Sequence, residues 1–148
     1  MGTFAGDTII APGAFPAAFA AACTANTDVA NGTEVDVAGA TITVVTTKVN
    51  AQFFCIGSFY FSMLAASSGI ALGKLNVDGV NQAGFANFTG LNTVPDRVNS
   101  TQAWSGVLAT AGSHTLKLRA VGPGTTGTPA TPAHRVNPVS TTITVFVF

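Results

Sequence analysis

From Glu34 onward the chain alternates short apolar runs with turn residues, a pattern typical of β-strands. In residues 40–47 (ATITVVTT), β-branched side chains alternate between the two faces of one strand. In His114–Val121 (HTLKLRAV), Leu116 and Leu118 share one face, and polar residues occupy the other. Each pattern predicts a strand with one buried face.

The segment Gln52–Leu64 (QFFCIGSFYFSML) differs because apolar residues occupy both alternating sets of positions. One set contains Phe53, Cys55, Phe59, Phe61 and Met63, and the other contains Phe54, Ile56, Tyr60 and Leu64. A strand with two apolar faces is covered on both sides. In a two-layer domain this predicts the core on one side and a partner on the other.

Turn signals separate the remaining runs. Asp78-Gly79 directly follows the run Ile70–Val77 and predicts a tight hairpin. Ala103–Leu108 carries the single Trp, and Ser140–Phe148 (STTITVFVF) closes the chain as a further strand. Residues 122–133 are rich in Thr, Gly and Pro and predict a loop. Many short strands without a long helix predict an all-β, antiparallel two-sheet sandwich.

Residues 1–32 form a distinct, Ala-rich segment that ends at the turn signal Asn31-Gly32. Pro16 suits the first turn of a short helix through Ala17–Cys23, although a helix of that length needs a surface to pack against. We therefore expect an N-terminal arm over residues 1–32 and a sandwich domain over residues 33–148. The arm's candidate contact residues are Phe4, Ile9, Ile10, Phe15 and Phe19.

Charge is scarce in this sequence. Six acidic and six basic residues give 8% charged residues and a net charge of zero, where a soluble domain carries about 25% charged residues. The scattered charges predict no nucleic-acid partner and no polybasic membrane patch. With 47% hydrophobic residues, we expect much of the exterior to be covered by other copies or by a larger assembly, or to be rich in Thr, Ser and Asn.

No constellation of catalytic residues stands out. His114 and His134 are the candidate general bases, but no nucleophile motif accompanies them, and we interpret both as surface or loop residues. Glu34 and Asp36 share one face of a strand, yet they also suit its exposed start. Cys23 and Cys55 have no partners at metal-ligand spacing and are expected to be buried free thiols. We predict no enzymatic activity, no cofactor and no metal.

The first thirty residues contain no Lys or Arg, so the positive n-region of a secretory signal is missing. The most apolar run near the start, residues 17–23, is far shorter than the ~20 residues of a membrane span. We therefore expect synthesis in a cytoplasm and no membrane partner.

The order of the sequence runs resembles a known group of proteins. VDVAGATITVVTT, a long apolar strand, KLNVDGV, WSGVLATAGSHTLKLRA and a closing TTITVFVF follow one another over residues 33–148. This series resembles the small jelly-roll domains of tailed-bacteriophage virions, which are similar to the tumour-necrosis-factor-type jelly roll and usually assemble as trimers. No catalytic residue comes with the resemblance.

The resemblance implies a structural role, with two alternatives. The first is a capsid decoration (cement) protein, made in the host cytoplasm, that binds the major capsid protein as a homotrimer on the virion exterior. The second is a receptor- or glycan-binding head of a fibre or tail, with Trp104 and the loops 81–102 and 122–138 around its site. For the trimer contacts we predict Phe59, Phe61, Phe146 and Phe148.

Overall fold

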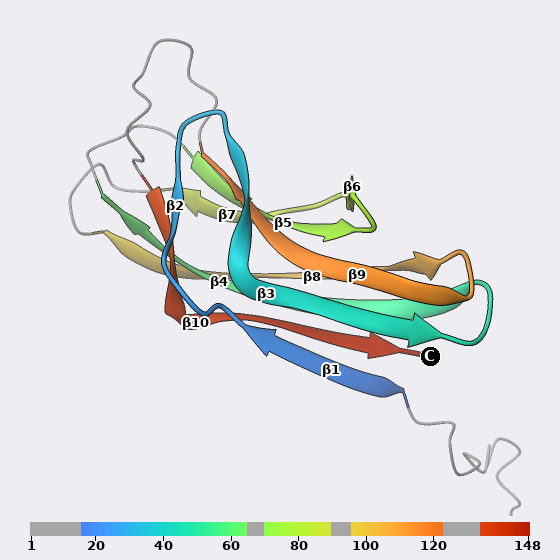
Figure 1. Cartoon of the computed structure of the whole chain (residues 1–148). Helices are drawn as coiled ribbons and strands as arrows, with labels where there is room; N and C mark the ends of the chain where they lie inside the picture. The colour runs from blue at the N-terminus through green and yellow to red at the C-terminus, as the bar shows by residue number, and fades with distance from the viewer. Residues whose placement is uncertain (1–15, 65–69, 90–95, 123–133) are drawn as a thin grey trace, which may run out of the picture.

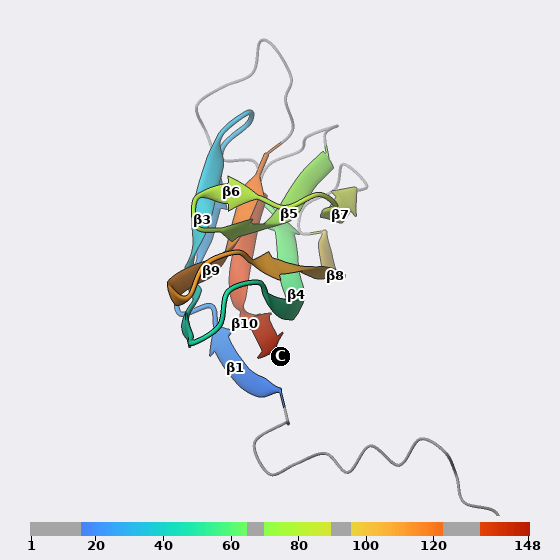
Figure 2. The ribbon, with the colours of Figure 1, turned by 90° about the vertical axis from the view of Figure 1, so that its right-hand side faces the viewer.

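The computed structural model describes residues 16–64, 70–89, 96–122 and 134–148, and these residues form two packed β-sheets (Figures 1 and 2). All strand pairings are antiparallel, and the described residues contain no helix. The strands are β1 (Ala17–Ala22), β2 (Thr27–Val29), β3 (Glu34–Thr46), β4 (Ala51–Met63), β5 (Ile70–Val77), β6 (Val80–Asn81), β7 (Ala86–Thr89), β8 (Arg97–Leu108), β9 (Gly112–Val121) and β10 (His134–Val147).

The strand order identifies the topology as a jelly roll. One sheet, here called sheet A, has the order β1-β10-β4-β8, with β2 also paired to β10. The other, sheet B, has the order β3-β9-β5-β6, with β7 also paired to β5. Early strands thus pair with late ones, β1 with β10 and β3 with β9, as in a double Greek key. The predicted all-β, two-sheet sandwich is confirmed.

The core lies between the sheets and is rich in aromatic side chains. Phe59 and Phe61 of β4 stack with ring centroids 5.5 Å apart, and Phe61 stacks in turn on Phe88 of β7 at 5.6 Å. All three rings are fully buried. Leu116 and Leu118 of β9 are also fully buried, as the alternation in that strand predicts.

The C-terminal part of the predicted arm belongs to the sandwich. The helix predicted for residues 17–23 is wrong, because β1 is a strand that pairs with β10 from Ala17–Val147 to Ala22–Thr142. β2 pairs with the start of β10. Phe19 points inward and packs against the core of its own chain. Residues 17–22 and 27–29 are therefore sheet strands, and only residues 1–15 of the arm lie outside the described residues.

The predicted hairpin at Asp78-Gly79 is confirmed. Both residues have a positive φ, 50° for Asp78 and 89° for Gly79, which is the requirement of a type I′ turn. The turn joins β5 to the two-residue strand β6, through pairs Asn76–Asn81 and Val77–Val80.

Candidate functional site

The outer face of sheet A is built from side chains without charge. Three rows of four residues cross the sheet from β1 through β10 and β4 to β8. The rows are Ala18–Phe146–Phe54–Ser105, Ala20–Thr144–Ile56–Ala103 and Ala22–Thr142–Ser58–Thr101. We call these twelve residues the uncharged face. It consists of small, hydroxylated and apolar side chains, so covering it desolvates no ion.

The alternation within β4 creates the apolar part of this face. Phe53, Cys55, Phe59 and Phe61 point into the core, so Phe54 and Ile56 point outward, where they are 39% and 36% exposed. Phe54 packs beside Phe146 of β10, with ring centroids 6.4 Å apart. The strand is thus apolar on both sides, as predicted, and its outer side has no cover within the described part of the chain.

The predicted contact residues fall into two groups. Phe59 and Phe61 have no exposed surface, so their side chains serve the core of their own chain and cannot reach a second copy. Phe146 lies on the uncharged face, and the alternation of β10 places Phe148, which is 65% exposed, on the same side. The sequence analysis missed Phe54 and Ile56. With both sets of positions in β4 apolar, the pattern could not show which set faces inward.

Of the predicted arm contacts, Phe19 lies on the inner side of β1, as described above. Phe4, Ile9, Ile10 and Phe15 lie outside the described residues.

Charged residues of sheet A gather at the end where β10 begins. There Arg135 forms a double hydrogen bond with Asp28 of β2. Arg97, the first residue of β8, lies in the same row, because both arginines pair with Ser62 of β4. The hydrogen bonds from Arg135 hold the pKa of Asp28 below its usual range, even though burial opposes the shift. The three rows of the uncharged face begin beyond this end.

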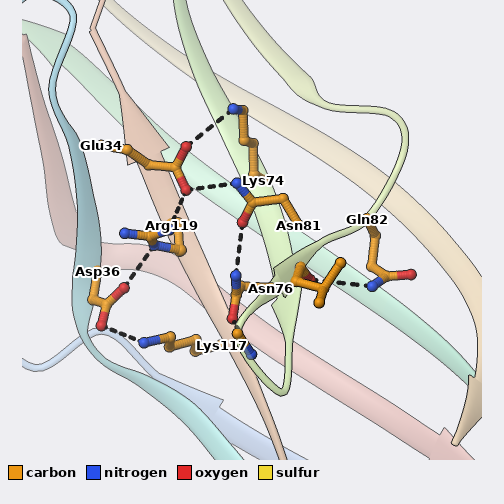
Figure 3. A network of polar contacts seen from close by, with 10 residues as sticks. Glu34, Asp36, Lys74, Asn76, Asn81, Gln82, Lys117 and Arg119 are labelled. Carbon is orange, nitrogen blue, oxygen red and sulfur yellow. Dashed lines mark hydrogen bonds and ion pairs between the residues drawn. The ribbon is translucent and has the colours of Figure 1, made fainter.

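The outer face of sheet B has the opposite character (Figure 3). Glu34 pairs with Lys74 at 3.1 Å and also with Arg119, and it accepts a hydrogen bond from Asn81. Asp36 pairs with Lys117 at 2.6 Å and with Arg119 at 2.8 Å. Every carboxylate in this network is therefore matched by a cation from a neighbouring strand.

The network also bears on whether Glu34 and Asp36, which share one face of β3, could act as a pair of catalytic acids. The hydrogen bond from Lys117 is the main cause that lowers the pKa of Asp36. Burial raises the pKa of Glu34, but its hydrogen bonds and the nearby cations outweigh that effect and lower it. General acid catalysis needs a carboxyl group that retains its proton near neutral pH. Glu34 and Asp36 have the environment of surface ion pairs.

Both histidines are buried, so their assignment to the surface was wrong. His114 is 4% exposed and contacts Asp78 and the carbonyl of Thr110 with its two ring nitrogens. His134 is fully buried at the start of β10, edge-on to Phe88. The burial of neither histidine was predictable from the sequence, because a single His in a strand can face either side.

The thiols and the tryptophan are also internal. Cys23 and Cys55 are free and buried, as predicted, and burial raises the pKa of Cys55 to about 12. Trp104, proposed for a glycan site, is 4% exposed, and its indole N–H donates to the Gly84 carbonyl.

In the described ranges, no group of three or more potential ligands could hold a metal ion. No helix there is long and apolar enough to span a membrane.

Comparison with known proteins identifies the fold and no family. The sequence matches no family model, and no curated protein matches it. Among solved structures, the chain is similar to the Eiger TNF of S. frugiperda, with a TM-score of 0.54 and 13% identity over 90% of this chain and 93% of that one. Murine APRIL gives a TM-score of 0.53 with 7% identity, covering 88% of this chain and 98% of that chain. The globular domain of zebrafish complement 1qA gives 0.51 with 10% identity, covering 89% and 96%. The fold is a jelly roll of the tumour-necrosis-factor type.

Proposed function

We propose that this chain is a structural protein of a bacteriophage virion that assembles as a homotrimer and decorates the capsid exterior. A β-sandwich binding or structural domain agrees with the fold of its structural neighbours. The phage role rests on the resemblance of its sequence runs to small virion jelly rolls. No enzymatic activity and no cofactor are part of this proposal.

The uncharged face is the observation that supports assembly of the trimer. Sheet B places its charged network in water, whereas sheet A presents Phe54, Ile56 and Phe146 among alanines and hydroxyl groups. Apolar surface gains about 25 cal/mol for each Å² removed from water. Association through this face costs no desolvation of charge, and closed symmetry lets every copy hide the same patch.

In the proposed decoration role, the trimer binds the capsid lattice through its N-terminal residues. A protein that binds only the assembled lattice stabilises that lattice by mass action. In this proposal the major capsid protein is contacted by residues 1–15, through Phe4, Ile9, Ile10 and Phe15. These apolar side chains gain free energy when a receiving surface covers them.

Light scattering of purified variants tests the trimer. We expect a mass of about three times the 14.9 kDa chain for the wild type, and a loss of trimer in Phe54→Asp, which places a charge on the uncharged face. The matched control is Val45→Asp, because Val45 is 72% exposed on the outer face of sheet B. The interface is elsewhere if the control dissociates and Phe54→Asp remains trimeric.

Electron microscopy of virions from cells that produce the chain tests the decoration role. We expect density for the jelly roll on the capsid exterior and its loss when residues 1–15 are deleted. The deletion must stop before Ala17, because removing β1 would expose one side of β10. Undiminished capsid binding by a trimeric truncated protein would contradict the role of these residues. Density at a fibre or tail tip would favour the alternative of a receptor- or glycan-binding head.

A further inference from the structure

The strongest unassigned feature is a buried histidine with two hydrogen-bond acceptors. His114 of β9 is 4% exposed, and its Nδ1 lies 2.6 Å from Oδ2 of Asp78. Its Nε2 lies 2.9 Å from the carbonyl oxygen of Thr110. The other oxygen of Asp78, Oδ1, accepts a hydrogen bond from the Thr115 amide at 2.8 Å.

These contacts specify the protonation state of the ring. A backbone carbonyl can only accept, so Nε2 must carry a proton. An ionised carboxylate also only accepts, so Nδ1 must carry one as well. Burial raises the pKa of Asp78, but the hydrogen bonds from His114 and Thr115 outweigh it and hold that pKa below its usual value. His114 is therefore an imidazolium in this arrangement.

Asp78 is the charged group that faces His114 in the described structure. On β3, the neighbours are Val44, which is opposite His114 in register, and Thr46, whose hydroxyl donates to the Thr110 carbonyl at 3.1 Å. Lys117, further along β9, forms an ion pair with Asp36.

The three groups connect separate turns at one end of sheet B. Asp78 is in the turn between β5 and β6, and Thr110 is in the turn between β8 and β9. Asp78 has a φ of 50°, and its amide donates to the Thr115 carbonyl at 2.9 Å. β6 has only two residues, both exposed. Its Asn81 also forms hydrogen bonds with Asn76 and Glu34, so the Asp78 contact is one of several that hold this hairpin.

We propose that His114, Asp78 and the Thr110 carbonyl form a pH-sensitive clasp that releases the β5–β6 hairpin when His114 loses its proton. Deprotonation leaves a nitrogen lone pair opposite one of the two acceptors and removes the charge that attracts Asp78. The hydrogen bond to Asp78 is the main cause that raises the pKa of His114 above its ordinary value. The contribution of the clasp is therefore complete below that ordinary value and is lost as the pH rises through the raised one.

NMR titration and amide hydrogen exchange test the clasp on the full chain. We expect His114 to titrate above an ordinary histidine and to hold protons on both ring nitrogens below that transition. Over the same transition, protection of the amides of residues 79–82 should fall by about tenfold or more, beyond the intrinsic base catalysis of exchange. A His114 that titrates at or below the ordinary value would overturn the proposal.

Two variants separate the clasp from a general effect of pH. Asp78→Asn keeps a residue that tolerates a positive φ but removes the charge, so the titration of His114 should move down. His114→Gln has no titrating ring, so the extra pH dependence of the hairpin should disappear while the core amides of β4 stay protected. His134→Leu is the control and should leave the hairpin transition in place. An unchanged transition in His114→Gln contradicts the clasp.

Discussion

Glycines opposite aromatic rings determine how the core of this sandwich closes. A Cβ at Gly73 would lie 2.6 Å from the ring of Phe59, and a Cβ at Gly106 would lie 2.7 Å from Phe53. At Gly57 it would lie 2.8 Å from Leu118 and 2.9 Å from Trp104. The space left by each missing side chain is filled by a large residue of a neighbouring strand or of the facing sheet. A glycine in a strand is thus a packing requirement here.

Replacing Gly73 with Ala should therefore destabilise the protein. The Phe59 ring is fully buried and would have to shift within the packed core, so we expect a loss of about 1–3 kcal/mol in the free energy of unfolding. Chemical denaturation measures the change. Thr43→Val, an exposed and still β-branched position on β3, is the control and should shift stability by less than about 0.5 kcal/mol. Equal stabilities of Gly73→Ala and the wild type would show that the ring can move.

His134 predicts a loss of stability in acid. Neither of its ring nitrogens has a hydrogen-bond partner in the described structure, and burial lowers its pKa. Its neighbour Arg135 is engaged by Asp28. The unfolded chain binds a proton near pH 6.5 more readily than the folded one, so stability is full above that pH and falls below it.

The measurement is the free energy of unfolding of the wild type and of His134→Leu between about pH 7 and pH 5. The wild type should lose more stability over this range, so the variant gains relative to it as the pH falls. Parallel curves for the two proteins would mean that His134 does not titrate differently on folding.

At the scale of elements, β1 shows where sequence reasoning fails. Its sequence, AAFAAA, is dominated by the residue with the highest helix propensity, and Pro16 stands at a favourable helix start. Six residues are too few for a stable isolated helix, however, and β10 offers a complete row of backbone partners. Tertiary pairing overrides local preference here. Ala18, Ala20 and Ala22 then form the edge of the uncharged face.

β10 is interrupted by a bulge with its own hydrogen bonds. Its register against β4 shifts between Asn137 and Thr142. The fully buried Thr141 hydroxyl accepts from the Tyr60 amide at 2.9 Å and donates to the Asn137 carbonyl at 2.7 Å. A side chain thus replaces the backbone partners that the shift removes.

Thr141→Val tests the bulge, because it keeps the shape of the side chain and removes both hydrogen bonds. Leaving these backbone groups without their partner should cost about 1–3 kcal/mol of unfolding free energy, measured by denaturation. Thr41→Val is the control, since Thr41 is an exposed threonine on β3 of sheet B, away from the uncharged face. A similar effect of the two substitutions would count against a structural role of the Thr141 hydroxyl.

For the whole molecule, the sequence predicts the architecture better than the surfaces. Alternation and the Asp78-Gly79 turn were enough to predict an antiparallel sandwich, because each depends on local chemistry. The orientation of β4 was not predictable from its own residues. Whether Phe59 or Phe54 faces the core depends on the glycines and rings of other strands, such as Gly73 opposite Phe59. The candidate site therefore emerged only with the packed sheets.

The separation of charged and uncharged faces makes a final prediction about the assembly. An interface held by ion pairs weakens as salt screens them, with a screening length of about 10 Å at 0.1 M and about 3 Å at 1 M. The uncharged face contains no ionised group, so its association should persist when sodium chloride rises over that range, and sulfate should strengthen it. Sedimentation equilibrium at several salt concentrations measures this, with Phe54→Asp as the dissociated reference. A trimer that dissociates as salt rises would instead indicate an interface through the charged network of Glu34, Asp36 and Arg119 on sheet B.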